Sequence, residues 1–585
     1  MNRNAALREF KKLKSQVKQI DEIVHHSKGN ALIEHETVVR KKILSLNEIG
    51  SEGIKDFDEV ISKYQDILDY IGEKLIEKYN KDNDTEFDYY QVVRGNYNAL
   101  INSGIMTVLT KKHIPSVIAD EFSKNFPDNP KEEYREARGM KRKFYIHLGD
   151  TNTGKTYNAI QSLKKSKCGV YLSPLRILAL ENFERLNREG VVCDLQTGEE
   201  EILKENATHT SCTIEKLNLK KQYDVAVIDE IQMIDDSQRG AAWTRAILGV
   251  RAKEVHVCGA INAKSIIETI LKDTGDEYEI IEYTRKIPLE VQQEEFKTNK
   301  IENGDAIVVF SKKKVLQLSK QFSEQGIKAS VIYGDLPPEV RKMQYELFLS
   351  GETKLLITTD AIGMGVNLPI RRIIFLSLKK YDGEELRDLT SQEVKQIAGR
   401  AGRIGIYDVG YTASVGKGYK FLEDKLEEKD KVITKAVIGP SEAILRIRTL
   451  PLIEKLAIWS TRQEKLDYYR KMDIGDYIIV LDKIKRFKLR ESVQWNLLKI
   501  AFDVSNEDLM NQFLFYVDEK FVIRSKTLTK PTILSHTLDE LEIYYQKISI
   551  YYSFSKIFNL DFDVEWVYEE RRNITEEINE LLINM

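Results

Sequence analysis

The chain has 585 residues, of which 42% are hydrophobic and 31% are charged. One hydrophobic core does not grow to this size, so we expect three or four domains. The formal net charge of −3 excludes a chain that is basic over its whole surface, although it still allows one groove lined with Lys and Arg. No apolar run reaches the roughly 18 residues that a membrane span needs.

Residues 1–140 are expected to form a helical domain. Apolar side chains recur there with a period near 3.6, as between Val60 and Ile71, and strand-like alternation is nearly absent. The first twenty residues carry six Lys or Arg and one Glu, which mildly resembles a mitochondrial presequence. The spacing of Leu7, Phe10 and Leu13 equally fits an amphipathic helix that packs on its neighbours, and we favour that helix.

Two series of short apolar runs follow a break at Asp128-Asn129-Pro130, and they alternate with helical stretches. This alternation is typical of parallel sheets covered by helices on both faces. We therefore expect two α/β domains in tandem, at 141–285 and 286–420, joined near Thr284–Pro288. The predicted strands are Phe144–Leu148, Gly169–Leu172, Val225–Ile228 and Val255–Val257 in the first series, and Ala306–Phe310, Ser330–Tyr333, Leu355–Ile357 and Ile373–Leu376 in the second.

Helical periodicity returns after residue 420 and indicates a C-terminal helical domain at 421–585, with Gly439-Pro440 as a break. The run Leu538–Ile557, rich in Ile and Tyr, predicts a buried helix. The expected fold is thus α/β, with two parallel-sheet domains between N-terminal and C-terminal helical domains.

The four cysteines are widely spaced and form no C-x-x-C pair, so we expect a reduced compartment rather than a disulfide framework. His209, Cys212, His256 and Cys258 each lie in or beside an apolar, strand-like run. We interpret them as core residues and not as zinc ligands.

The segment Gly149–Thr156 reads G-D-T-N-T-G-K-T and predicts a phosphate-binding loop. It follows an apolar strand and precedes a helical pattern, which is the arrangement that such a loop requires. Gly149 and Gly154 let backbone N–H groups converge on phosphate oxygens, Lys155 would reach the outer phosphates, and Thr156 would hold Mg²⁺. Thr151, Asn152 and Thr153 complete the predicted cradle. The alternative is a plain glycine turn that caps a helix.

A carboxylate pair supports a magnesium nucleotide at this loop. Asp229 and Glu230 follow the apolar run Val225–Ile228, so they emerge at the end of a predicted central strand. Asp229 would order a metal-bound water, and Glu230 would polarise the attacking water.

The second α/β domain contributes Gln396, Arg400 and Arg403 within the sequence Q-I-A-G-R-A-G-R. Two arginines three residues apart share one face of a helix. If they neutralise charge on the transferred phosphate, hydrolysis depends on closure between the domains. The alternative is a solvated helix face.

These segments are similar to motifs I, II and VI of the superfamily 2 DExH-box helicases. Other helicase motifs match Pro174–Ala179, Thr197–Glu200, Ser211–Glu215, Cys258–Ala260, Val309–Ser311 and Thr358–Asn367. More specifically, Asp229–Met233, Arg239–Ala246 and Val331–Pro338 resemble the suppressor-of-Var RNA helicases of the mitochondrial degradosome and their bacterial relatives. Two features depart from the family pattern: Asp150 stands where the family usually has proline, and no glutamine-bearing element for adenine recognition precedes the loop.

The resemblance implies tandem RecA-like domains in an ATP-dependent helicase that uses Mg²⁺ and moves 3′→5′, mainly on RNA. The use of other NTPs stays open. It also implies a role in RNA decay or surveillance beside a 3′→5′ exoribonuclease, in a bacterial-like cytoplasm or, alternatively, in the mitochondrial matrix. A motor for DNA or DNA–RNA hybrids remains open, as does a nucleic-acid-binding scaffold with an inactive ATPase. By motif correspondence, Gly365 and Asn367 would lie near the nucleotide ribose. The residues expected to line the strand are Pro174, Arg176, Thr197, Gly198, Thr213, Ser311 and Thr359.

Overall fold

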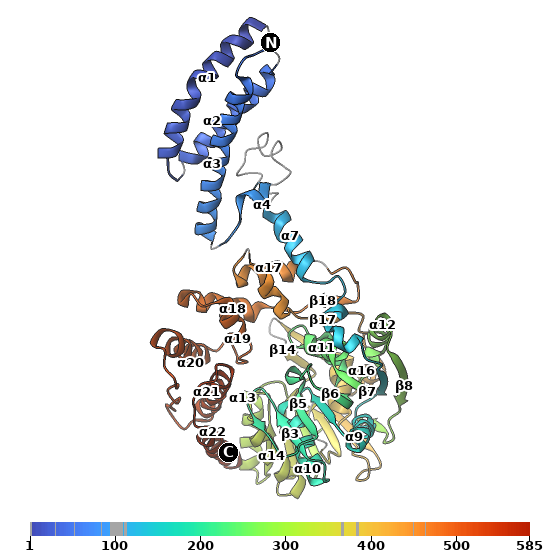
Figure 1. The fold of residues 1–585 in the computed structure, drawn as a ribbon. Coiled ribbons are helices and arrows are strands. Elements are labelled where there is room, and N and C mark those ends of the chain that lie inside the picture. The colour runs from blue at the N-terminus through green and yellow to red at the C-terminus, as the bar shows by residue number, and fades with distance from the viewer. Residues whose placement is uncertain are drawn as a thin grey trace. The chain divides into compact units, whose positions relative to one another are not determined.

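The computed structural model describes residues 3–29, 31–51, 53–83, 85–93, 109, 114–363, 368–381, 385–448, 450–462 and 464–585 (Figure 1). The chain forms two compact units, which are described separately. The first comprises Met1–Asp128 and Pro440–Arg462, and the second comprises Asn129–Gly439 and Gln463–Met585. None of the described helices combines the length and apolar character that crossing a bilayer requires.

The first unit is helical. Its helices are α1 (Arg3–His26), α2 (Ala31–Ile49), α3 (Phe57–Asn83), α4 (Tyr89–Val93), α7 (Ile114–Asn125), η8 (Glu442–Arg446) and α17 (Leu452–Thr461). Phe10 of α1 stacks on Phe57 at a ring distance of 5.8 Å, and Tyr64 of α3 donates to the carbonyl of Leu13 at 2.8 Å. The 3.6-residue period therefore buries one face of each long helix, and the basic N-terminal stretch is part of this packing.

The second unit begins with a lobe built on an eight-stranded sheet, here called lobe 1. Its strand order is β4-β3-β5-β2-β6-β7-β1-β8, and every described pairing is parallel except β3 with β4. The strands are β1 (Lys143–Gly149), β2 (Gly169–Ser173), β3 (Cys193–Gln196), β4 (Glu201–Ile202), β5 (His209–Thr213), β6 (Gln222–Ile228), β7 (Arg251–Gly259) and β8 (Glu277–Tyr283). The helices around them are α8 (Arg135–Arg138), α9 (Lys155–Lys165), α10 (Arg176–Arg188), α11 (Gly240–Gly249) and α12 (Lys264–Thr274).

Lobe 2 is built on a six-stranded parallel sheet in the order β11-β12-β10-β13-β16-β9. Its strands are β9 (Leu289–Val291), β10 (Asp305–Val308), β11 (Ala329–Ile332), β12 (Leu355–Thr358), β13 (Arg372–Phe375) and β16 (Gly410–Ser414), with the hairpin β14 (Lys379–Tyr381) and β15 (Leu386–Asp388) beside them. Its helices are α13 (Lys312–Glu324), α14 (Pro338–Ser350), α15 (Ser391–Ala398) and α16 (Tyr419–Glu427). The predicted tandem parallel sheets are confirmed.

The C-terminal part is mostly helical, with α18 (Gly475–Ile484), α19 (Glu491–Leu497), α20 (Glu507–Asp518), α21 (Leu538–Ile557) and α22 (Val564–Ile583). The predicted buried helix at 538–557 is α21, with the same bounds. Two short parallel strands, β17 (Ala436–Ile438) and β18 (Tyr469–Lys471), were not predicted from the sequence. Ala436 and Tyr469 belong to the same hydrophobic core as Trp243 of lobe 1, because β17 packs against α11 and β18 pairs with β17.

Short helices complete the unit. They are η2 (Pro130–Tyr134), η3 (Ile214–Lys216), η4 (Ile231–Asp235), η5 (Ile261–Ala263), η6 (Thr298–Lys300), η7 (Asp360–Gly363), η9 (Lys485–Phe487) and the π-helical turn η10 (Glu519–Ile523).

A buried ion pair fastens the start of β1, the strand between β7 and the edge strand β8. The guanidinium of Arg142 is 2% exposed and donates to both carboxylate oxygens of Asp276, at 3.0 and 2.5 Å. The same group donates to the carbonyls of Ile247 and Val250 at the end of α11, both at 3.0 Å. One side chain thus ties β1 to β8 and satisfies carbonyls at a helix C-terminus.

We expect Arg142→Met to lower the free energy of unfolding by about 3–5 kcal/mol, because it leaves a buried carboxylate and two carbonyls short of donors. Urea unfolding of the full chain measures this change. The matched control is Lys141→Met, since the Lys141 side chain is 88% exposed beside Glu277. Equal unfolding midpoints for the two variants would contradict the role given to Arg142.

Candidate functional site

The predicted phosphate loop lies between β1 and α9, at the carboxyl end of β1. Gly149 has φ +155°, and a Cβ at this position would lie 2.3 Å from the carbonyl oxygen of Tyr283. Gly154 is the N-cap of α9 with φ +87°, and Asn152 also lies in the left-handed region. Only a residue without a side chain fits at Gly149, so the first glycine of the motif is required by strand packing.

Lys155 lies within the arch of the loop. Its Nζ donates to the carbonyl of Gly149 at 2.7 Å and to the carbonyl of Asp150. Burial lowers the pKa of Lys155, and the charges of Glu230 and Asp229 act in the opposite direction. The Thr153 hydroxyl donates to the Asp150 carbonyl at 3.0 Å, and residue Asp150 itself is exposed. The loop therefore closes around its lysine without contribution from the Asp150 carboxylate to these bonds.

Thr156 and Asp229 meet at the start of α9. The hydroxyl of Thr156 donates to Oδ1 of Asp229 at 3.0 Å. Hydroxyl and carboxylate oxygens are the hard donors that Mg²⁺ prefers, so this pair fits a magnesium ion. The Tyr171 hydroxyl donates to Oδ2 of Asp229 at 2.7 Å, and Trp243 Nε1 donates to its carbonyl at 2.8 Å. Burial raises the pKa of Asp229 to about 6, with a further contribution from Glu230.

The contacts of Tyr171 and Trp243 with Asp229 were not predicted from the sequence. Both residues lie in apolar runs, where an aromatic side chain is expected to be part of the hydrophobic core, and only the fold brings their hydroxyl and indole N–H groups to Asp229.

Glu230 follows β6 in the left-handed region, at φ +51°, which is a strained conformation for a residue other than glycine. The side-chain amide of Gln232 donates to Glu230 Oε2, and the other end of the amide accepts from the N–H of Ala260 at 3.1 Å. Gln232 thus connects the second carboxylate to the segment after β7. Its role was also missed, although it lies in the same motif.

The loop touches lobe 2 through backbone groups. The Asn152 amide donates to the carbonyl of Gly402 at 2.9 Å, and a Cβ at Gly399 would lie 2.9 Å from Cβ of Thr151. Arg285, in the join between the lobes, donates to the carbonyls of Gly399, at 2.8 Å, and Ala401. Thr151 and Asn152 are therefore interlobe contacts, and the glycine at 399 allows the close approach.

The expectation that Arg400 and Arg403 share a helix face is wrong. Helix α15 ends at Ala398 and the arginines follow in turns, where Gly402 has φ +77°. Arg400 donates through Nε to the carbonyl of Gly363 at 3.1 Å. Burial raises the pKa of Glu181 on α10 of lobe 1, and the charges of Arg185, Arg400 and Arg403 act in the opposite direction. Both arginines of lobe 2 are thus near enough to lobe 1 to influence its charges.

Gln396 lies on α15, and its side chain would be 3.2 Å from a Cβ at Gly363. The other predicted nucleotide contacts, Gly365 and Asn367, lie outside the described residues.

The predicted strand-lining residues lie at the carboxyl ends of parallel strands in both lobes. Pro174, Thr197 and Thr213 end or follow β2, β3 and β5, while Ser311 and Thr359 follow β10 and β12. Several of these hydroxyl oxygens already accept hydrogen bonds from backbone N–H groups. Thr197 Oγ1 accepts from the N–H of Glu200 at 2.9 Å, Thr359 Oγ1 accepts from the N–H of Ala361, and Ser311 caps α13. Gly198 accepts through its carbonyl from Ser553 of α21 at 2.9 Å. Arg176 is held by carboxylates and is treated below.

The histidines and cysteines named above are core residues in the structure. His256 bonds to His147, and His209 contacts the carbonyl of Leu163. Cys212 and Cys258 are free and buried. Within the part of the chain that the structure describes, no three His, Cys, Asp or Glu side chains are grouped so as to hold a metal ion.

Family models match three segments of the chain. Residues 130–283 match the DEXQ-box helicase domain of Suv3, residues 287–405 match the helicase conserved C-terminal domain, and residues 538–584 match the C-terminal domain of the ATP-dependent RNA helicase SUV3. The resemblance expected from the motifs is confirmed, and so is the RecA-like character of the two lobes.

The proteins that are similar in sequence to this chain are named as RNA helicases. The chain is 42% identical over 334 residues to "ATP-dependent RNA helicase SUV3, mitochondrial" of Saccharomyces cerevisiae, covering 56% of this chain and 45% of that protein. It is 44% identical over 319 residues to the mitochondrial DExH16 helicase of Arabidopsis thaliana, covering 53% of this chain and 56% of that protein. The chain thus spans about half the length of these relatives.

The chain also shows a low structural similarity to a solved RNA-bound protein. For S. cerevisiae Dbp5 bound to RNA and ADP BeF3 the identity is 18% and the TM-score 0.39, over 54% of this chain and 92% of that chain.

The expectation of a bacterial-like cytoplasm is wrong. The relatives are named as mitochondrial SUV3 helicases, which favours the mitochondrial matrix. The helicase motifs could not have distinguished the two compartments, because contacts to phosphates and to a strand have the same chemistry in the cytoplasm and in mitochondria.

We expect Gly399→Ala to lower NTP turnover about tenfold or more while nucleotide binding persists, because the added methyl group would lie 2.6 Å from the carbonyl oxygen of Lys395 and 2.9 Å from Cβ of Thr151, so the turn after α15 must shift away from the loop. Steady-state hydrolysis and nucleotide titration measure the two quantities. Gly334→Ala is the control, since a Cβ at that position meets nothing within 4 Å. Turnover equal to that of the control would show that this contact does not matter.

Proposed function

We propose that this chain, whose lobe 1 and last two helices match family models of SUV3 helicases, is an ATP-dependent RNA helicase. One observation carries the proposal: the loop with Lys155 and Thr156 adjoins the Asp229–Glu230 pair, and its own residues touch the segment of lobe 2 that holds Arg400 and Arg403. Strand-facing positions follow the strands of both lobes at the corresponding edge. A nucleotide cycle that moves the lobes would therefore also move the strand contacts.

The proposed roles follow from the geometry. Lys155 binds the outer phosphates, and Thr156 with Asp229 holds the magnesium ion, whose charge neutralises the phosphates when it is bound. Glu230 orients the attacking water and takes its proton, with its carboxylate held by Gln232. Arg400 and Arg403 act from lobe 2 on the charge that develops during transfer, and Gln396 supports the same segment.

The strand residues offer hydroxyls, backbone groups and helix starts, which suit phosphate and sugar contacts and follow a strand without reading its sequence. We propose RNA as the substrate because the similar proteins are named RNA helicases. Movement 3′→5′, the supply of ends to a 3′→5′ exoribonuclease and a location in the mitochondrial matrix belong to the same proposal. A motor on DNA or hybrids is the second candidate. The four-domain division at 1–140, 141–285, 286–420 and 421–585 also stays a prediction.

We expect Lys155→Ala to reduce ATP hydrolysis at least about a hundredfold, because the outer phosphates lose their charged partner, while single-strand binding without nucleotide persists. Turnover assays and fluorescence anisotropy with a labelled RNA check the two parts. Unchanged turnover would refute the assignment of the nucleotide site.

Arg400→Ala should leave nucleotide affinity within about threefold of the wild-type value and lower RNA-stimulated turnover about 10³-fold, the magnitude typical of arginines that act across an interface. Lys420→Ala, on the exposed part of α16, serves as a control for a lost positive charge on lobe 2. Wild-type turnover in the Arg400 variant would rule out catalysis from lobe 2.

Strand displacement on matched RNA, DNA and hybrid duplexes with 3′ or 5′ overhangs tests substrate and polarity together. We expect displacement of RNA from the 3′ overhang and little from the 5′ overhang. Equal displacement of DNA would favour the second candidate, and activity restricted to 5′ overhangs would contradict the proposed direction.

A further inference from the structure

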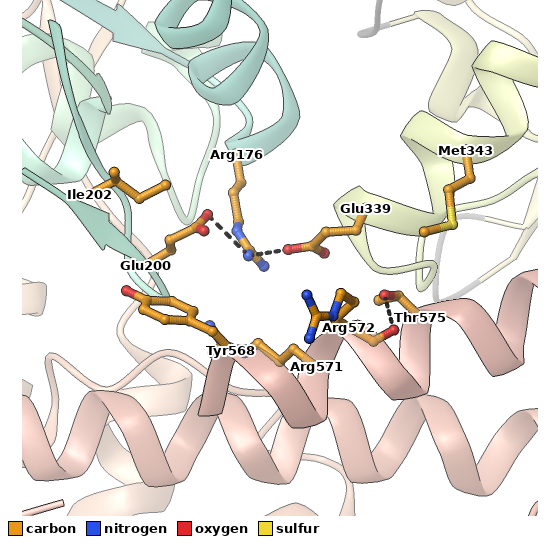
Figure 2. A pocket seen from close by; sticks show the side chains of 9 residues that line it. All are labelled: Arg176, Glu200, Ile202, Glu339, Met343, Tyr568, Arg571, Arg572 and Thr575. Atoms are coloured by element: carbon orange, nitrogen blue, oxygen red, sulfur yellow. Dashed lines mark hydrogen bonds and ion pairs between the residues drawn. The ribbon is translucent and has the colours of Figure 1, made fainter. Parts of the chain in front are cut away.

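A cavity of about 380 Å³ lies where lobe 1, lobe 2 and the C-terminal helix α22 meet (Figure 2). Figure 2 shows the guanidinium of Arg176 between Glu200 and Glu339 at the top of this cavity, with α22 below it. The lining residues include three arginines, Arg176, Arg571 and Arg572. Three carboxylates, those of Glu199, Glu200 and Glu339, lie against Arg176. Their charges offset one another, so the cavity is not a strongly basic site.

Every terminal donor of Arg176 is occupied. One terminal nitrogen donates to Glu199 at 2.9 Å and to the Tyr545 hydroxyl at 2.6 Å, and the other donates to Glu339 at 2.6 Å and to Glu200 at 3.4 Å. These are four of the five N–H groups of the side chain, and the fifth, on Nε, is buried and has no partner among the described residues. A strand phosphate could bind Arg176 only by displacing a carboxylate from it.

The partners of Arg176 come from three parts of the unit. Glu199 and Glu200 belong to the turn after β3 in lobe 1, Glu339 lies in the first turn of α14 in lobe 2, and Tyr545 lies on α21. The Tyr545 hydroxyl also donates to Glu339 at 2.9 Å. Arg176, Glu339 and Tyr545 therefore form a closed triangle of polar contacts, here called the latch.

Helices α21 and α22 contact both lobes around the latch. On the lobe 2 side, Lys312 of α13 donates to Asp539 and Glu542, both at 2.5 Å. On the lobe 1 side, Arg571 donates to the Glu199 carbonyl at 2.6 Å. The ring of Tyr545 lies between the guanidinium groups of Arg571, at 5.6 Å, and Arg176, at 6.0 Å.

The residues next to Arg176 also face lobe 2. Ile177 is 4% exposed and belongs to the hydrophobic core of lobe 2, together with Phe375 and Leu356. Further along α10, Glu184 pairs with Lys342 of α14 at 2.6 Å. One face of α10, from Arg176 to Glu184, thus contacts lobe 2 in this structure.

We infer that Arg176 is a positioning residue, which holds lobe 1, lobe 2 and α21 in one arrangement, and that it does not bind a strand phosphate. The inference rests on the proposed function, because it attributes the arrangement of the two lobes during hydrolysis to the latch. Lobe 2 cannot separate from lobe 1 without breaking the contact between Arg176 and Glu339. Loss of the latch therefore impairs hydrolysis, which needs Arg400 and Arg403 near lobe 1, while strand affinity stays unchanged.

The test compares Arg176→Gln, Glu339→Gln and the double variant in the full chain. RNA-stimulated ATP turnover gives kcat and KM, and RNA affinity without nucleotide is measured over a salt series. Each single substitution is expected to lower kcat about tenfold to a hundredfold, and the double variant no further than the more severe single one, because both changes remove the same contact. The RNA affinity and its salt slope should remain those of the wild type.

The opposite result is equally clear. If Arg176 binds a strand phosphate, Arg176→Gln weakens RNA binding and reduces the salt slope by about one, while Glu339→Gln leaves both unchanged. That outcome overturns the inference, as does an unchanged kcat in Glu339→Gln.

Two further variants control for folding and for the loss of a charge. Tyr545→Phe removes only the hydroxyl of the latch, so it should lower kcat several-fold with an unchanged thermal unfolding midpoint, and an unaffected kcat counts against the latch even if the charge variants do not fold. Arg572→Gln removes an arginine that lines the same cavity and makes none of these bonds, and it should behave as wild type. Absence of RNA-stimulated turnover in the wild type would refute the proposed function itself, independently of the latch.

Discussion

The candidate site depends on the parallel order of both sheets. In a parallel sheet every strand ends at the same edge, so the loops that follow the strands are brought together whatever their distance in the chain. The phosphate loop after β1 and the carboxylates after β6 meet in this way, and Thr156 reaches Asp229 at 3.0 Å across 73 residues of sequence. The positions expected to line a strand follow β2, β3, β5, β10 and β12 at the equivalent edges. Fold and chemistry are connected here by topology rather than by any single residue.

Burial then gives the site its electrostatic character. Asp229 lies in a dry environment, and its pKa is raised by desolvation while Tyr171 and Thr156 donate to its carboxylate. Lys155 is buried as well, which lowers its pKa, and two neighbouring carboxylates oppose that change. Charges placed in such an environment interact more strongly than they would in water, so a bound phosphate would meet an arrangement that is already ordered. Trp243 supports it by fixing the backbone of Asp229.

The lobes are joined at two separate places. Near the loop, the side-chain amide of Asn152 donates to the backbone carbonyl of Gly402, and Arg285 of the join donates to the carbonyl of Gly399. At the N-terminus of α10, Arg176 contacts the carboxylate of Glu339 in lobe 2 and a tyrosine of α21. The first contact adjoins the phosphate loop, and the second includes the C-terminal helix α21.

The sequence by itself determined the elements and the motif chemistry. Period and alternation predicted the helical first unit, both parallel sheets and helix α21, because these patterns depend on local geometry that each segment carries within itself. The phosphate loop, the two carboxylates after β6 and the two arginines of lobe 2 were recognised from residue type and spacing. Only the tertiary structure showed that Arg400 and Arg403 lie beyond the end of a helix, that Tyr171 and Gln232 serve the carboxylates, and that Arg176 faces Glu339. These facts depend on which distant segments meet, and the burial and partners of a polar side chain are properties of that meeting rather than of the local sequence.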